Sequence, residues 1–280
     1  MFRLMNNVRT AILLALLMSI FVAVGSIWGQ QGMIMALIFG GLMNVIAYFF
    51  SDKIALATMR AQPVTEQEAP ELVAMVRQLA GRANLPMPRV YICPQQAPNA
   101  FATGRNPKNA VVAVTQGLLQ MMDRNELMGV IGHELAHIKH RDILIQTVAA
   151  TVAGAITSVG IMLRFMPIGG DDRRGNVFEV LAMIILAPIA ASLIQLAISR
   201  KREYNADSFG AELAGDPMYL ARALDKLHRQ NRMIPMHVAL DSQKSMFIVQ
   251  PFSGRDALDL FNTHPSLKNR LRALIGRDSL

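Results

Sequence analysis

The chain of 280 residues contains a single cysteine, Cys93. A disulfide within the chain is therefore excluded, and so is a metal site made of clustered cysteines. We interpret Cys93 as a small apolar residue of the protein interior. A metal site in this protein would have to use histidines and carboxylates.

Charged residues are scarce as well. They make up 17% of the chain, against about 25% in an average soluble domain. Hydrophobic residues reach 52%, and the mean hydropathy is +0.30, which is typical of a membrane protein with soluble parts. The net charge of +8 is accompanied by no nucleic-acid motif, and the basic residues gather at the ends of apolar segments. We expect a lipid bilayer as partner and no nucleic acid.

Long apolar segments are abundant. Residues 11–28 and 33–50 carry no charge, and each is about long enough to cross a hydrocarbon core, so they predict a tight hairpin of two spans. The basic start of the chain also resembles a signal peptide, but no small-x-small cleavage site follows it. Residues 143–163 and 177–198 predict a second hairpin, with buried core helices as the alternative.

The basic residues predict an orientation. If all four segments cross, every Lys and Arg falls on one side except Arg164, Arg173 and Arg174. The positive-inside rule places the larger group in the cytoplasm. We interpret the basic run at residues 200–202, directly after the fourth segment, as an anchor at the membrane surface.

A helix is predicted around the sequence GHELAHIKHRD. Asp123 is a candidate N-cap, and Glu126 follows three residues later, which is a capping-box pattern. Apolar residues recur at helical spacing from there to about His140.

Two histidines in this helix are candidate metal ligands. His133 and His137 are four residues apart, so both imidazoles lie on one face and can bind one zinc ion. Glu134 can hold and deprotonate a metal-bound water without binding the metal itself. The metzincin pattern is excluded, because it would need glycine and histidine where the chain has His140 and Ile143.

A third ligand is predicted after the fourth apolar segment. Glu203 and Asp207 are again four residues apart. Glu203 would complete a two-histidine, one-glutamate set with water in the fourth position, and Asp207 could orient a ligand imidazole. A solvated acidic face is the alternative. Two crossings between the second histidine and Glu203 would return the chain to the same side, as one zinc ion per chain requires.

Two further segments, around His264 and between residues 89 and 115, each allow two interpretations. Thr263 is a candidate cap with Pro265 near the first helical position, so His264 is either an oxyanion donor or a surface turn residue. Residues 89–93 and 110–115 have strand character. The connection between them could pair with a peptide as an extra strand, or it could be an ordinary hairpin loop with Phe101 in the core.

The chain resembles the HtpX group of membrane-bound zinc metalloproteases, relatives of the CaaX prenyl proteases. The resemblance rests on an apolar N-terminal hairpin followed by YFFSDKIAL, PNAFATGRNPKNAVVAVTQGLL, HELAHIKHRD, REYNAD and THPSLKNRL. It implies a mainly α, multi-pass membrane protein with a gluzincin-like α+β protease domain on the cytoplasmic face. The implied activity is ATP-independent endopeptidase action on membrane proteins of the bacterial inner membrane, in quality control and stress response.

The resemblance also implies roles for single residues. The zinc ligands would be His133, His137 and Glu203, with Glu134 as catalytic base and His264 as the residue that stabilises the transition state. A substrate-pairing edge strand would comprise Asn99, Ala100, Phe101 and Ala102.

We divide the chain accordingly into four parts. Residues 1–50 form the first membrane hairpin, and residues 51–142 the first half of the protease domain with the zinc-motif helix. Residues 143–198 form the second hairpin, and residues 199–280 the second half with the third ligand.

Three rival functions remain. An intramembrane protease would place the zinc motif in an apolar span, whereas Arg124, Lys139 and Arg141 surround it here. A CaaX-type prenyl protease would need a prenylated substrate. A membrane scaffold with structural zinc would normally use four protein ligands, and the pattern supplies three.

Overall fold

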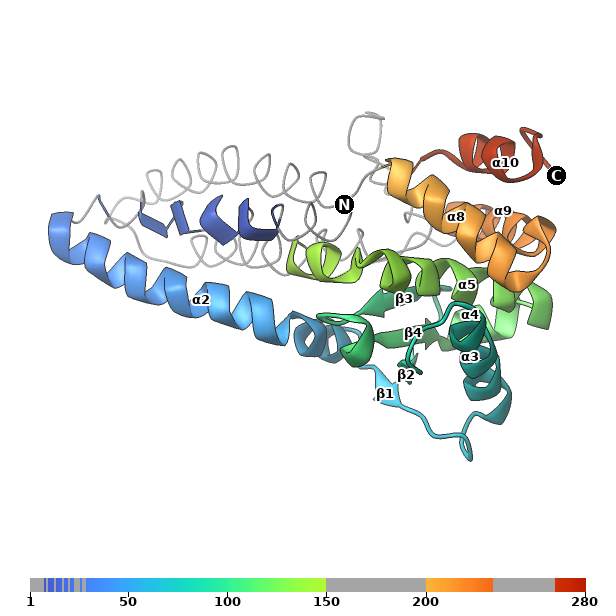
Figure 1. Ribbon diagram of the computed structural model, residues 1–280, viewed down its shortest axis with the longest axis horizontal. Coiled ribbons are helices and arrows are strands. Elements are labelled where there is room, and N and C mark those ends of the chain that lie inside the picture. The colour runs from blue at the N-terminus through green and yellow to red at the C-terminus, as the bar shows by residue number, and fades with distance from the viewer. Residues whose placement is uncertain are drawn as a thin grey trace.

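A computed structural model describes residues 29–149, 200–233 and 265–280, together with several residues between 8 and 26. This part of the protein is mostly helical, with one small mixed sheet (Figure 1). The helices are α2 (Gly29–Thr58), α3 (Pro70–Arg82), α4 (Gln116–Met121), α5 (Arg124–His140), α8 (Arg200–Ala214), α9 (Pro217–Met233) and α10 (Leu267–Ile275). The strands are β1 (Gln62–Pro63), β2 (Arg89–Cys93), β3 (Ala100–Thr103) and β4 (Val111–Thr115), and a short 3-10 turn covers Pro107–Asn109.

Helix α2 is long and apolar. Its 30 residues span about 45 Å at 1.5 Å per residue, and it extends away from the sheet to the far end of the molecule in Figure 1. Its most apolar window has a mean hydropathy of 2.1, yet only 11% of that window is buried. Among the described residues it is the one helix that could cross a membrane by length and composition. The predicted span at residues 33–50 lies inside it, and the helix continues to Thr58.

The described residues of the first apolar segment lie against α2. Asn44 Nδ2 donates a 3.0 Å hydrogen bond to the carbonyl of Leu14, and the rings of Phe21 and Phe39 meet edge to face with centroids 5.7 Å apart. The two segments therefore run antiparallel, as a hairpin requires. That both cross the membrane stays a prediction.

The sheet has the order β1-β2-β4-β3. The β-branched strand β4 is buried throughout, and it pairs with β2 in parallel and with β3 antiparallel. The two predicted strands are thus real, but they do not form a hairpin. The connection between them contributes β3, which is an edge strand of the described sheet.

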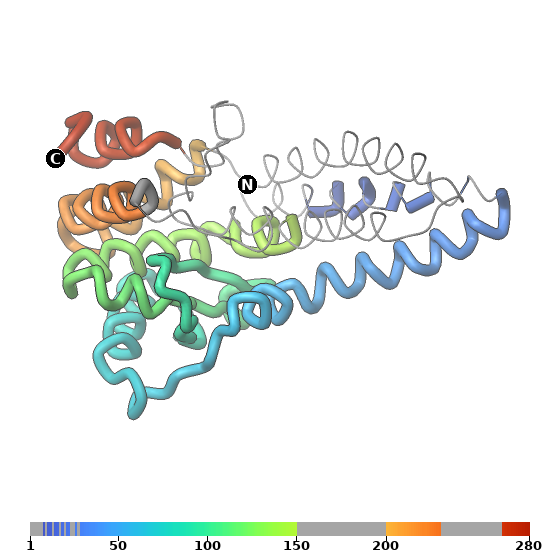
Figure 2. The backbone as a smooth tube through the Cα atoms, turned by 180° about the vertical axis from the view of Figure 1, so that it is seen from behind, coloured from blue at the N-terminus to red at the C-terminus, as the bar shows by residue number. Residues whose placement is uncertain are grey.

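Helix α5 lies at the centre of the part of the molecule that contains the sheet, between the sheet and helices α8 and α9 (Figure 2). Thirteen consecutive residues, from Glu126 to Ile138, are buried. The apolar core around the helix includes Val76, Leu79, Val112, Val114, Leu118, Ile131, Leu135, Leu220 and Leu224. Any polar side chain on α5 is therefore held by packing on several sides.

The last turns of α2 pack on the sheet. Leu56 and Met59 form a small apolar cluster with Cys93, Phe101 and their neighbours on β4. Cys93 is fully buried, as predicted for a small apolar residue. Phe101 is buried in the same cluster, so its ring is part of the core.

Candidate metal centre

The helix that carries the two histidines begins and ends as predicted. The Asp123 carboxylate accepts hydrogen bonds from the backbone N–H groups of Asn125 and Glu126, and Glu126 Oε2 accepts one from the Asp123 N–H at 3.0 Å. This capping box satisfies N–H groups that the first helical turn leaves without partners. The helix ends where Arg141 adopts a left-handed conformation, with φ 60° and ψ 38°.

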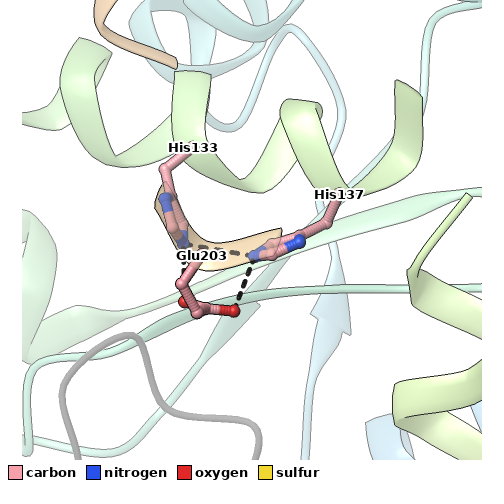
Figure 3. A group of neighbouring side chains, drawn as sticks. All are labelled: His133, His137 and Glu203. Carbon is pink, nitrogen blue, oxygen red and sulfur yellow. Dashed lines mark hydrogen bonds and ion pairs between the residues drawn. The ribbon is translucent and has the colours of Figure 1, made fainter. Parts of the chain in front are cut away.

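Three predicted ligands lie together in the interior. His133 and His137 project from α5 and Glu203 from α8, and their polar atoms converge (Figure 3). The two Nε2 atoms are 3.2 Å apart. Glu203 Oε2 lies 3.7 Å from His133 Nε2, and Glu203 Oε1 lies 3.7 Å from His137 Nε2. Among the described residues, this is the one group of three or more His, Cys, Asp or Glu side chains with metal-ligand spacing.

These separations fit a metal ion. Ligands about 2.0–2.1 Å from a tetrahedral ion are about 3.3–3.4 Å from one another, close to the observed 3.2–3.7 Å. Two Nε2 lone pairs that face each other at the shorter distance would repel without a cation between them. Burial alone would lower the pKa of His137, but the carboxylates of Asp142, Glu203 and Glu134 outweigh it and raise that pKa to about 9. Surroundings that favour a proton this strongly also favour a cation.

A carboxylate and an arginine hold the ring of His133. Its Nδ1 lies 2.9 Å from Asp207 Oδ1, and Arg270 Nε donates to Asp207 Oδ2 at 2.8 Å while Arg270 Nη2 binds Oδ1. Burial alone would raise the pKa of Asp207, but Arg270 and His133 outweigh it and keep that pKa below its ordinary value. An ionised Asp207 keeps the proton of the imidazole on Nδ1, so the Nε2 lone pair faces the cluster.

The ring of His137 has a similar but longer set of contacts. Its Nδ1 is 3.5 Å from Asp142 Oδ2, and Asp142 Oδ1 is 3.6 Å from Arg202 Nη1. All three side chains are buried. Each histidine is therefore backed by an aspartate and an arginine.

Glu134 lies beside the cluster and is also buried. Burial raises its pKa to about 7, although His137 and a backbone hydrogen bond from Ala102 act in the opposite direction. A carboxyl group with a pKa near 7 can take up and release a proton at neutral pH, as a general base and acid must.

Strand β3 presents part of its backbone to this region. The Thr115 N–H donates to the Asn99 carbonyl at 2.9 Å, and the register pairs Phe101 with Ala113. Because backbone groups alternate along a strand, those of Ala100 and Ala102 face away from β4. The hydrogen bond from Ala102 to Glu134 agrees with this direction.

Two glycines let α8 approach α5 closely enough to bring the predicted third ligand beside the histidines. A Cβ at Gly210 would lie 2.5 Å from the backbone nitrogen of His133, and one at Gly132 would lie 2.6 Å from the Gly210 carbonyl. The two helix backbones are thus in direct contact. Glu203 lies about two turns before Gly210 on the same helix, so this crossing sets its distance from the histidines.

Some predictions fall outside the described residues. These are His264, most of the two apolar segments at residues 143–163 and 177–198, and part of the segment at residues 11–28. The predicted cap of the C-terminal helix was wrong. Helix α10 begins at Leu267, and Ser266 caps it, with its hydroxyl accepting from the Asn269 N–H at 3.4 Å.

The sequence patterns missed three residues near the cluster. Asp142 and Arg270 drew no attention, because their partners are distant in the chain or lie beyond a turn. Arg202 was assigned to a surface anchor, yet it is 6% exposed and faces Asp142. The one local feature that could have identified any of the three is the position of Asp142, five residues after His137.

Comparison with known proteins gives consistent matches. Residues 66–278 match the sequence profile of peptidase family M48. A protease HtpX homolog of Desulforapulum autotrophicum is 50% identical over 276 residues, which cover 96% of this chain and 89% of the relative. The corresponding protein of Syntrophobacter fumaroxidans is 48% identical, with 96% and 98% covered. The crystal structure of S. mikatae Ste24p superposes on 98% of this chain with a TM-score of 0.51 and 16% identity, and the chain spans 66% of that protein's length, which is a likeness of fold.

Proposed function

The chain belongs to peptidase family M48, and from this premise we propose that it is a zinc endopeptidase of the bacterial inner membrane. Its proposed substrates are misfolded or damaged membrane proteins, cleaved on the cytoplasmic side during quality control and stress. That the chain is a metalloprotease follows from its family and its relatives. The metal, substrates and orientation are the proposal.

The buried cluster of His133, His137 and Glu203 carries the proposal. Structural zinc sites are normally closed by four protein ligands, whereas catalytic sites use three and leave one position for water. The described residues supply three. Zinc bound there would polarise the scissile carbonyl and lower the pKa of the attacking water.

The protein's own groups then perform the proton transfers. Glu134 accepts a proton from the attacking water and returns it to the leaving amine, a role that a pKa of about 7 supports. Asp207, fixed by Arg270, keeps the His133 ring in its ligating orientation. His264 is proposed, on the resemblance, to donate to the oxyanion. Arg270 lies six residues after it and reaches Asp207, which supports placing this segment beside the metal centre.

The substrate is proposed to pair with strand β3. Of the four residues suggested by the resemblance, Ala100 and Ala102 direct their backbone groups away from β4, toward the side where Glu134 lies. Phe101 buries its ring in the core, and the Asn99 carbonyl binds Thr115. We therefore narrow the pairing residues to Ala100 and Ala102. An added strand there would bring its scissile carbonyl toward the metal centre.

Aromatic and basic side chains near the end of α2 support a site close to the bilayer. The Arg105 guanidinium lies 5.5 Å from the ring centroid of Phe49, and Lys53 Nζ lies 5.2 Å from that of Phe50. Lys and Arg are enriched in the cytoplasmic segments next to the ends of membrane helices, and both cations lie against rings near the end of this helix. Helix α2 then packs directly on the sheet, so cytoplasmic loops and exposed ends of membrane proteins would be within reach.

Cleavage of unfolded casein by the detergent-purified chain tests the proposal. Zinc-loaded wild type, chelator-treated wild type and Glu134→Ala are compared, with Glu212→Ala as a control for an exposed glutamate, and bound zinc is quantified in each. We expect cleavage by zinc-loaded wild type and the control only, with zinc still bound to Glu134→Ala.

Cleavage by Glu134→Ala at the wild-type rate would contradict the proposal and favour structural zinc. A prenylated peptide as second substrate distinguishes the CaaX-type alternative, which predicts that this peptide is cleaved in preference to casein.

A further inference from the structure

Asp142 is tied to His137 twice. Its backbone N–H donates to the His137 carbonyl at 2.9 Å, and its Oδ2 lies 3.5 Å from His137 Nδ1. The left-handed conformation of Arg141 reverses the chain between them. The turn that ends α5 therefore brings this carboxylate back to the ring of the second ligand, and Asp142 is 1% exposed.

Arg202 approaches the same carboxylate from the other helix. Its Nη1 lies 3.6 Å from Asp142 Oδ1, although the two residues are 60 positions apart in the chain. Arg202 directly precedes Glu203, so the first turn of α8 supplies a metal ligand and a guanidinium at consecutive positions. A carboxylate this deeply buried needs a charged partner, and Arg202 is a cation at that distance.

We infer that Asp142 and Arg202 are positioning residues for His137, with Asp142 orienting the ring and Arg202 holding Asp142. The inference rests on the proposed metal centre. With the Nδ1 proton directed at Asp142, the Nε2 lone pair of His137 is directed at the metal. Because Arg202 and Glu203 are neighbours, the pair also ties the orientation of a ligand on α5 to the position of the ligand on α8.

The contacts of this pair are longer than those of Asp207 and Arg270. Loss of a hydrogen-bonding partner behind a metal-ligating histidine lowers metal affinity about 10- to 100-fold. We expect Asp142→Asn to lie at the lower end, about tenfold, because the Nδ1 to Oδ2 distance is 3.5 Å against 2.9 Å for the His133 pair.

Zinc affinity of the full-length, detergent-purified chain, measured by chelator competition, tests the inference. The variants are Asp142→Asn, Arg202→Gln, their combination, and Arg202→Lys. Asp123→Asn, at the other end of α5, and Lys201→Gln, exposed beside Arg202, are matched controls. Visible absorption of cobalt-loaded protein reports the ligand geometry, and the melting temperature with and without zinc separates metal binding from folding.

We expect weaker zinc binding and an altered cobalt spectrum in Asp142→Asn and a smaller effect in Arg202→Gln. The double variant should lose little more than Asp142→Asn alone, because Arg202 acts through Asp142. Arg202→Lys should restore most of the affinity, and the controls should match wild type. If Asp142→Asn does not fold, the comparison of Arg202→Gln with Arg202→Lys decides.

Wild-type zinc affinity and an unchanged cobalt spectrum in folded Asp142→Asn would overturn the inference. So would equal affinity in Arg202→Gln and wild type. Failure of the wild type itself to bind zinc would instead overturn the proposed function, so the two failures are distinguishable.

Discussion

Helices α2 and α5 invert the usual relation between polarity and burial. The most apolar window of α2 has a mean hydropathy of 2.1 and is 11% buried, whereas α5 carries two histidines and two glutamates among thirteen consecutive buried residues. An exposed apolar surface of this size marks contact with a membrane or another protein. Buried polar groups are costly unless paired. The two helices therefore have different surroundings: α2 exposes an apolar surface, whereas α5 holds polar side chains in the interior.

The two helices meet through the sheet. The exposed part of α2 gives way to Leu56 and Met59, which pack against Phe101 and Cys93. The neighbouring residue Ala102 contacts Glu134 on α5. The apolar helix is therefore packed against the same strand that borders the metal centre.

The largest expected effect is the loss of Glu203, the proposed third ligand, which lies on α8. In Glu203→Ala, only the two histidines remain as ligands. We expect this variant to bind less than one zinc ion per chain and to cleave casein only at background level. The exposed Glu212 on the same helix provides the control Glu212→Ala, which should retain both. Zinc per chain and casein cleavage measure the difference. Stoichiometric zinc in Glu203→Ala would remove Glu203 from the ligand set.

Removal of the arginine behind His133 should destabilise the protein next most strongly. Arg270→Leu leaves the Asp207 carboxylate buried without its partner, which typically costs about 3–5 kcal/mol, and it should weaken zinc binding too. Arg272→Leu removes an exposed arginine of the same helix that pairs with Asp278. We expect no measurable change there. Equal unfolding free energies for the two variants would show that the buried pair of Asp207 and Arg270 stabilises the protein no more than the exposed pair does.

A charged residue on α2 tests whether the exposed apolar face of this helix lies in lipid. Ile38 is 64% exposed, and Ile38→Lys should disfavour membrane insertion by about 2.5–3.5 kcal/mol. Met87, an exposed apolar residue of the protease part at 40%, provides the control Met87→Lys, which should have no effect. The fraction of chain in the membrane, measured with a topology reporter, separates them. Equal insertion of both variants would mean that the exposed face of α2 does not lie in lipid.

The smallest effect concerns the start of α5. Asp123→Ala removes the capping box and should lower the free energy of unfolding by about 1 kcal/mol, with zinc affinity unchanged. Asp123→Asn preserves a capping oxygen and should match wild type. Chemical denaturation measures the free energy of unfolding of both variants. A loss of zinc from Asp123→Ala would show that the helix start and the metal centre are coupled more tightly than the packing suggests.

The features of α5 that depend on a few neighbouring residues were predictable from the sequence. The cap at Asp123, the end of the helix at His140 and the shared face of the two histidines all follow from helix geometry within a few residues. Glu203 was predictable because the same spacing recurs at a place that two crossings would return to the first side. The partner of Asp207 was not, because Arg270 is 63 residues away and nothing around it marks it as buried.

The sheet shows the same limit. Strand character at residues 89–93 and 110–115 was visible. The parallel pairing of β2 with β4 and the place of β3 at the edge depend on contacts between segments. Arg202 was misassigned because a basic run beside an apolar segment is the usual sign of an anchor. Its burial follows only from the approach of α8 to α5, which the two glycines permit.

X-ray absorption at the zinc edge of the purified, zinc-loaded chain tests the central claim most directly. A catalytic centre at this cluster predicts two imidazole nitrogens and oxygen ligands from Glu203 and water, at about 2.0–2.2 Å. The spectrum should be retained in Glu134→Gln, which removes the base and leaves the ligands. Sulfur scattering from Cys93, or fewer than two imidazoles, would contradict the assignment of the site.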